Sequence, residues 1–268
     1  MLRTALGRND FDHGILTHTG HRPWSMPRGP WIMTQSWHDL LFAHWPVGAD
    51  LLGPLVPSVF PLDRFEGESW VGIIPFHMTN VAPRGVPALP RISAFPELNV
   101  RTYVTLDGRP GIYFFSLDAG NELAVHAARL LFNLPYHSAT MRVSREDGWT
   151  VYSSKRRSRS AGRAEFAGRY RPTGPVAHPA AGTLEHFLTE RYCLYEVDRR
   201  GHPYRVEIHH PPWPLQAAEL ETDRNTMAES NGLPGLNGTP LLHFSRRQDM
   251  VAWLPTRLGA KGLGMPAG

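Results

Sequence analysis

Hydrophobic positions along this chain recur mostly at every second residue, which is the period of a β-strand. The pattern is strictest in residues 97–105, where Leu98, Val100, Thr102 and Val104 alternate with Glu97, Asn99, Arg101 and Tyr103. An Asp-Gly pair follows at 107–108 and an apolar run returns at 111–117, so the two runs predict a hairpin. Further strands are predicted at 70–76, 138–144, 149–154, 164–171, 193–198 and 204–210.

Two segments show the spacing of an amphipathic helix. The first spans 122–132, between a candidate N-cap at Asn121 and Pro135, which stops it. Its expected apolar stripe consists of Leu123, Ala127, Leu130, Leu131 and Leu134. The second begins after Thr183, and its expected apolar face is Leu184, Phe187 and Leu188. Many short strands with two or three helices predict an α+β, β-rich fold, a curved antiparallel sheet or barrel.

The middle of the chain shows no linker and no internal repeat, so we expect residues 31–256 to form one domain. Residues 1–30 are rich in Gly, Pro, His and Arg without periodicity and predict a flexible leader. Residues 257–268, with four glycines, predict a flexible tail. A hydrophobic content of 41% with 19% charged residues is sufficient for a substantial core.

The net charge of +4 raises the question of a nucleic-acid partner. Only two lysines occur, Lys155 and Lys261, and the one dense basic stretch lies within 155–171 between two predicted strands. We interpret this stretch as a hairpin with a solvated arginine tip, in preference to a phosphate-binding patch, and expect no nucleic-acid partner.

The sequence also predicts a cytoplasmic protein without a membrane segment. No run approaches the roughly 18 apolar residues of a membrane helix. Asp10, Asp12 and His13 stand where a signal peptide would need an apolar core. The single cysteine, Cys193, excludes an internal disulfide, fits a reducing compartment and is expected to be a buried thiol.

Five motifs in order resemble the YqjF-like family of bacterial proteins, from about Pro30 to Pro255. They are WHDLLFAHW at 37–45, FPELNVRTY at 95–103, FFSLDA at 114–119, GTLEHFLTERY at 182–192 and HHPPWPL at 209–215. This resemblance is specific but implies no activity.

The middle of the chain is more distantly similar to acetoacetate decarboxylases. Glu97 opens a strand, Asp118-Ala119 ends another before a helix, and Pro135 lies in the turn after that helix. The resemblance implies a cone-shaped β-barrel that encloses a pocket. The decarboxylases carry a lysine pair where this chain has Tyr136 and His137, and the first lysine forms a Schiff base. Neither side chain here can condense with a ketone, so that route is excluded.

The polar face of residues 97–103 has two interpretations. If it lines the barrel, Glu97, Asn99, Arg101 and Tyr103 meet in a cavity and must bond one another or a ligand. The opposite face would then pack outward against helices. If the face is exposed to solvent, these four polar residues are ordinary surface residues. We favour the cavity. His137 is either a proton relay or a histidine bonded to a loop carbonyl, and His44-Trp45 is either a pocket wall or, in our preferred reading, part of the core.

These residues predict a protein that binds a small oxygenated or anionic organic molecule. Arg101 would pair with the anion, Asn99, Tyr103 and Tyr136 would orient it, and Glu97 with His137 would move protons. The alternative is a non-enzymatic sensor or carrier on the same fold, so catalysis stays open.

No cofactor and no metal are expected. His186 and Glu190 lie four residues apart, but no third ligand follows at a recognisable spacing. The sequence leaves the oligomeric state open, a homo-oligomer included.

Overall fold

The computed structural model describes residues 10–89, 92–157, 162–198 and 200–259. The strands are β1 (Met33–Val47), β2 (Ser69–Pro83), β3 (Phe95–Leu106), β4 (Arg109–Ala119), β5 (Tyr136–Glu146), β6 (Trp149–Arg156), β7 (Glu165–Pro172), β8 (Cys193–Val197), β9 (Pro203–His209), β10 (Gln216–Asn225), β11 (Leu241–Ala252) and β12 (Thr256–Arg257). The helices are α1 (Ala49–Leu52), α2 (Glu122–Phe132) and α3 (Leu184–Thr189), with short 3-10 turns at His13–Thr17, Gly53–Leu55 and Glu229–Asn231. The β-rich fold class is confirmed.

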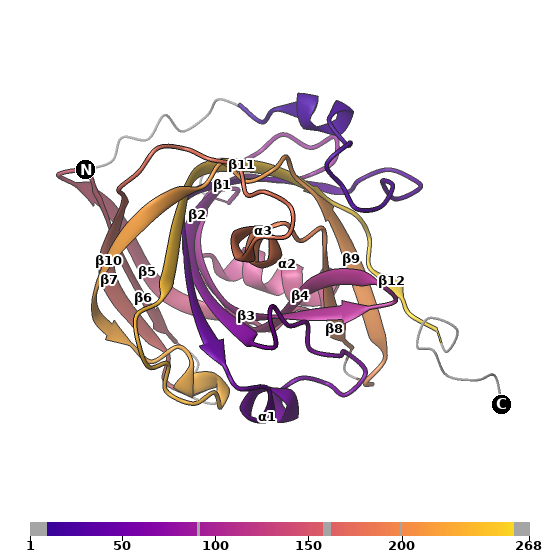
Figure 1. Cartoon of the computed structure of the whole chain (residues 1–268). Coiled ribbons are helices and arrows are strands. Elements are labelled where there is room, and N and C mark those ends of the chain that lie inside the picture. Colours follow the sequence, from indigo (N-terminus) through magenta and orange to yellow (C-terminus); the bar gives the residue numbers. More distant parts are fainter. Residues whose placement is uncertain (1–9, 90–91, 158–161, 199, 260–268) are drawn as a thin grey trace.

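The strands form one sheet that closes on itself twice. Their order is β12-β9-β8-β4-β3-β2-β1-β11-β10-β7-β6-β5, with additional pairings of β9 with β11 and of β4 with β5. The first pairing closes a ring from β9 through β4 and β1 to β11. The second closes a ring from β4 through β1 and β10 to β5. Figure 1 shows the first ring end-on, with α2 and α3 inside its outline and β5, β6, β7 and β10 to its left.

The shared strands β1 to β4 have a core on each face. In β1, Leu40 and Phe42 belong to the core of the first ring, whereas Leu41 and Ala43 belong to the core of the second. In β1 the residues of both faces are apolar from Leu40 to Ala43, so this part of its sequence reads as a continuous apolar run without alternation.

In β3, the face opposite the polar residues packs against other strands. Leu98 and Val100 lie in the core of the second ring with Tyr152, Phe166 and Tyr170 of β6 and β7. The expectation that this face packs outward against helices is wrong. Strands β6 and β7 of the second ring cover this face of β3 instead.

The predicted hairpin joins β3 to β4, and Leu106 pairs directly with Arg109. Asp107 and Gly108 both have positive φ, +52° and +70°, as the tight turn of a two-residue hairpin requires. The hairpin brings the polar face of β3 into register with the inner face of β4.

Both predicted helix caps are confirmed. Asn121 Oδ1 accepts from the backbone N–H of Leu123 and of Ala124, and Thr183 Oγ1 accepts from the N–H of His186. The predicted stripe of α2 needs a correction, because Leu123 is 67% exposed and Val125 and Phe132 are buried instead. Those two residues lie seven apart, on one helix face. The side chains at 127–131 lie outside the described part of the structure.

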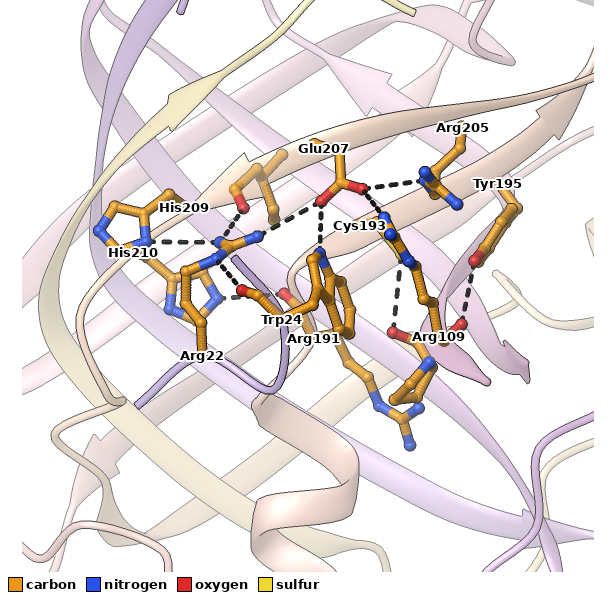
Figure 2. A network of polar contacts seen from close by, with 12 residues as sticks. Arg22, Trp24, Arg109, Arg191, Cys193, Tyr195, Arg205, Glu207, His209 and His210 are labelled. Atoms are coloured by element: carbon orange, nitrogen blue, oxygen red, sulfur yellow. Dashed lines mark hydrogen bonds and ion pairs between the residues drawn. The ribbon is translucent and has the colours of Figure 1, made fainter. Parts of the chain in front are cut away.

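The expected flexible leader is wrong for residues 10–30, which pack on the outside of the barrel. Phe11 and Ile15 are buried against Val251 and Trp253. Arg22 Nη2 and Trp24 Nε1 donate to the Glu207 carboxylate on β9, at 3.3 and 2.8 Å (Figure 2). Each of these contacts joins one residue to a distant part of the chain, so they produce no periodic pattern in the local sequence. The sequence pattern therefore did not predict them. Residues 1–9 lie outside the described segments.

The other end of the chain shows a similar contact. β12 pairs with β9, and the N–H of Leu258 donates to the Pro203 carbonyl at 2.9 Å. The predicted tail is therefore anchored at its first residues, and 260–268 lie outside the described segments. Within the described segments, the helices are too short or too polar to cross a membrane.

The arginine-rich stretch is largely paired. Lys155 pairs with Glu165, and Arg169 and Arg171 pair with Glu221 and Glu219 of β10. Arg156 is not solvated as expected, because its guanidinium is buried and makes two 2.8 Å bonds to Asp118. Arg159 lies outside the described residues.

Candidate functional site

The first ring encloses a cavity of about 180 Å³. Most of its wall is apolar and comes from β1, β2, β4, α2, β8, β9 and β11. Apart from the indole N–H groups of Trp37 and Trp213, five lining residues carry polar groups: Gln35, Glu97, Asn99, Arg101 and Tyr136. Four of these five come from β3 and the first residue of β5, so the polar groups gather on one side of an apolar chamber.

The cavity wall contains Glu97, Asn99 and Arg101, the location that we favoured over solvent. Their exposed fractions are 3, 5 and 7%. Tyr103 lies on the same strand face but does not line the cavity. Its hydroxyl accepts from Arg101 Nε at 3.2 Å and lies 2.6 Å from Nε2 of His44. His44 is buried in the core, as we preferred, and holds the far end of this face.

Glu97 is a buried carboxyl group with one strong donor. Burial raises the pKa of Glu97 to about 8, and the hydroxyl of Tyr136, which donates to Oε2 at 2.7 Å, partly offsets that rise. The negative charge of Asp118 acts in the same direction as burial. At neutral pH the side chain is therefore mostly a neutral acid, which has a proton to donate. The hydroxyl of Tyr152 donates to the Glu97 carbonyl at 2.7 Å and fixes the backbone there.

Arg101 differs from the other buried arginines of the described chain. Arg22, Arg156 and Arg191 each pair with a carboxylate. Arg101 donates from Nη2 to the Leu188 carbonyl in the last turn of α3, at 3.2 Å, and lies over the rings of Phe42 and Tyr103. No carboxylate of the described residues lies within 4.0 Å of it. A buried guanidinium without a carboxylate partner is energetically costly, so an anion bound from outside the chain would stabilise it.

Two lining residues carry buried polar atoms without a hydrogen-bond partner in the described chain, Oδ1 of Asn99 and Nε1 of Trp213. Sequence reasoning did not assign Trp213 to the site, although it lies in the motif at 209–215. Trp213 follows the end of a strand and two prolines, so no periodic pattern predicts which way its side chain points.

His137 does not line the cavity. It follows Tyr136 in β5, and successive side chains of a strand point to opposite faces. The expectation that His137 moves protons together with Glu97 therefore needs correction, because Tyr136 lines the cavity and His137 does not.

Of the pair considered for metal binding, Glu190 is engaged in other contacts. Glu190 accepts from the N–H of Trp213 at 2.8 Å and from the hydroxyl of Tyr192. No group of three or more His, Cys, Asp or Glu placed to hold a metal occurs among the described residues. Cys193 is buried, and burial raises the pKa of its thiol to about 12.

No lysine of the described chain lines the cavity. Lys155 is on the outside, paired with Glu165, and Lys261 lies beyond the described residues. The cavity wall therefore offers an acid, an amide, a phenol and a guanidinium, but no amine nucleophile from the described segments.

The closed barrel with its internal cavity is the acetoacetate decarboxylase-like fold. An acetoacetate decarboxylase from Legionella pneumophila superimposes with a TM-score of 0.55 over 95% of this chain and 98% of that one, at 15% identity. The enduracididine biosynthesis enzyme MppR, in its complex with pyruvate, gives 0.57 over 88% and 93% at 10% identity. At these identities the likeness concerns the fold alone.

The sequence itself identifies the family. Residues 34–249 match the model of DUF2071, described as an uncharacterized conserved protein. The chain is 46% identical to uncharacterized protein YqjF of Bacillus subtilis (strain 168) over 229 residues, which cover 85% of this chain and 93% of that protein. This chain belongs to the DUF2071 family, and the predicted family resemblance is confirmed.

Proposed function

We propose that this protein binds a small organic anion in the barrel cavity and that Glu97 exchanges a proton with it without any lysine. One observation carries the proposal. Of the four buried arginines in the described chain, Arg101 lines the cavity and has no carboxylate partner. A guanidinium in that position pairs with a carboxylate through two parallel N–H donors.

The remaining polar groups suit acid–base chemistry on the bound anion. Asn99 and Tyr136 orient it, and Glu97, neutral near pH 7, donates its proton to a developing oxyanion. Enolisation, hydration and lactone hydrolysis are the reaction classes that such a set serves. Tyr136 is the hydrogen-bond partner of Glu97 in this scheme, because His137 does not line the cavity.

A second candidate is a sensor or carrier that holds the same ligand without chemistry. The apolar majority of the cavity wall favours it, because binding of an apolar body needs no reactive group. Turnover separates the two: a carrier returns its ligand unchanged, and Glu97→Gln then alters affinity but no rate.

Isothermal titration calorimetry with a series of short carboxylic acids tests the proposal. We expect binding by the unmodified protein and a loss of at least about tenfold in Arg101→Gln. Arg101→Lys keeps the charge but lacks the fork and should be intermediate. Arg224→Gln, at an exposed arginine, is the matched control. Thermal unfolding verifies that each variant is folded. Equal affinity of wild type and both Arg101 variants would overturn the proposal.

A further inference from the structure

We infer, on the basis of the proposed function, that the cavity takes a monocarboxylate with an apolar body and a hydroxyl group next to its carboxylate. Two residues of the cavity wall, Asn99 and Trp213, carry buried hydrogen-bonding atoms that have no partner among the described residues. Since buried polar groups in folded proteins are normally satisfied, these atoms mark the positions that an occupant complements.

One unsatisfied atom is an acceptor and the other is a donor. Asn99 lies close enough to Glu97 to help lower the pKa of that carboxyl, and its Oδ1 has no donor among the described residues. Trp213 is 3% exposed, and its Nε1–H has no acceptor among them. A hydroxyl group both donates and accepts, so it can satisfy Asn99 while an oxygen of the same ligand accepts from Trp213.

The charges of the wall allow one anionic group. Arg101 is the single cation that lines the cavity within the described residues. The acid on the same strand, Glu97, is held mostly neutral by burial. A second carboxylate on the ligand would lie against apolar side chains without a counter-charge, which is strongly unfavourable. The occupant is therefore a monoanion.

The geometry of β3 orders the polar groups. Arg101 and Asn99 are alternate residues of one strand, about 6.8 Å apart along it. A carboxylate at Arg101 thus leaves a neighbouring hydroxyl within reach of Asn99. The apolar part of the wall that β1 and β2 contribute, with Trp37, Phe76 and Met78, receives the apolar body.

The volume limits that body. An apolar cavity of about 150 Å³ holds benzene, so 180 Å³ suits a ligand with one short branched chain or one ring. The acid 2-hydroxy-4-methylpentanoate has this size and both polar groups. It has two matched counterparts: 4-methylpentanoate lacks the hydroxyl, and malate replaces the branched chain with a second carboxylate.

Calorimetric titration of these three acids tests the inference on the wild-type protein. We expect 2-hydroxy-4-methylpentanoate to bind at least about tenfold more tightly than 4-methylpentanoate, because a site with an unpaired acceptor rejects the analogue that lacks the donor. Malate should bind more weakly than both. In Asn99→Leu the preference for the hydroxyl should fall to about twofold or less. Asn237→Leu, at an exposed asparagine, should retain it.

The outcomes distinguish this inference from the proposed function. Equal affinity for the two monocarboxylates, with both lost in Arg101→Gln, overturns the hydroxyl and leaves the anion site intact. Binding of malate at least as tight as that of the branched acids overturns the apolar body. Absence of binding by every acid overturns the inference and the proposed function together. The wild-type comparison requires no substitution, so it holds even if a variant fails to fold.

Discussion

The phenol of Tyr136 donates a 2.7 Å hydrogen bond to Oε2 of Glu97, and both side chains are buried in the wall of the cavity. The Tyr136 hydroxyl therefore serves a carboxyl group in this chain. The pair is a neutral acid with one fixed donor, and its protonation is open to measurement.

The contribution of Glu97 to the stability of the fold should fall as pH rises. Its pKa is about 8 in the folded protein against 4.5 for the exposed group, so between these values the folded state binds more protons than the unfolded state. The contribution of Glu97 is therefore greatest below about pH 4.5 and declines through pH 8, by roughly 3 to 5 kcal/mol. Glu97→Gln should remove that part of the slope in urea unfolding measured from pH 5 to 9. An identical slope in both proteins would contradict the assignment.

Removing the donor should raise the pKa of Glu97 further. The Tyr136 hydroxyl stabilises the carboxylate form of Glu97. In Tyr136→Phe the midpoint of the pH-dependent decline in stability should therefore lie about one pH unit higher than in the wild type. Tyr113→Phe, on the neighbouring β4, is the control and should keep the wild-type midpoint. A midpoint that moves to lower pH in Tyr136→Phe would show that the phenol does not serve the carboxylate.

The buried pair of Asp118 and Arg156 should matter far more than the exposed pairs of the same region. Arg156→Met leaves the Asp118 carboxylate buried without its partner, at an expected cost of roughly 3 to 5 kcal/mol. Arg169→Met breaks an ion pair in which both side chains are about half exposed, and should cost about 1 kcal/mol or less. Chemical denaturation of both variants decides this, and similar costs would be the contrary result.

The segment before β1 should contribute to stability. Ile15 is 3% exposed, so Ile15→Ala should lower the free energy of unfolding by about 2 to 4 kcal/mol. Leu123→Ala, at a leucine that is 67% exposed, should change it by about 0.5 kcal/mol or less. A negligible effect of Ile15→Ala would restore the flexible leader that the sequence predicted.

Local signals predicted much of the fold. The alternation in 97–105, the Asp-Gly turn and the two caps each depend on neighbours within a few residues, and each was placed correctly. Strand β1 was not predicted, since apolar residues on both faces remove the alternation by which strands are recognised. Strand β11 was not predicted because polar residues interrupt it from Ser245 to Asp249. The second ring depends on the pairing of β4 with β5 and on β10, which are contacts between distant segments that no local pattern records.

The site was predicted in part for the same reason. The period of β3 placed Glu97, Asn99 and Arg101 on one face, and the family resemblance pointed that face inward. Tyr103 shares the face but is covered by His44 and α3. The sequence does not reveal this cover, because it comes from segments that are distant along the chain. Tyr136 and His137 are adjacent, and the sequence could not tell which of them faces the cavity. Trp213 enters from a loop without any period.

A crystal structure of the protein with 4-bromobenzoate tests the anion site most directly, because bromine scatters anomalously and marks the apolar end of the ligand. We expect the carboxylate within about 3 Å of the Arg101 guanidinium and the bromine against the apolar wall near Trp37 and Met78. A ligand bound outside the barrel, or bound inside it with its carboxylate away from Arg101, would contradict the central claim.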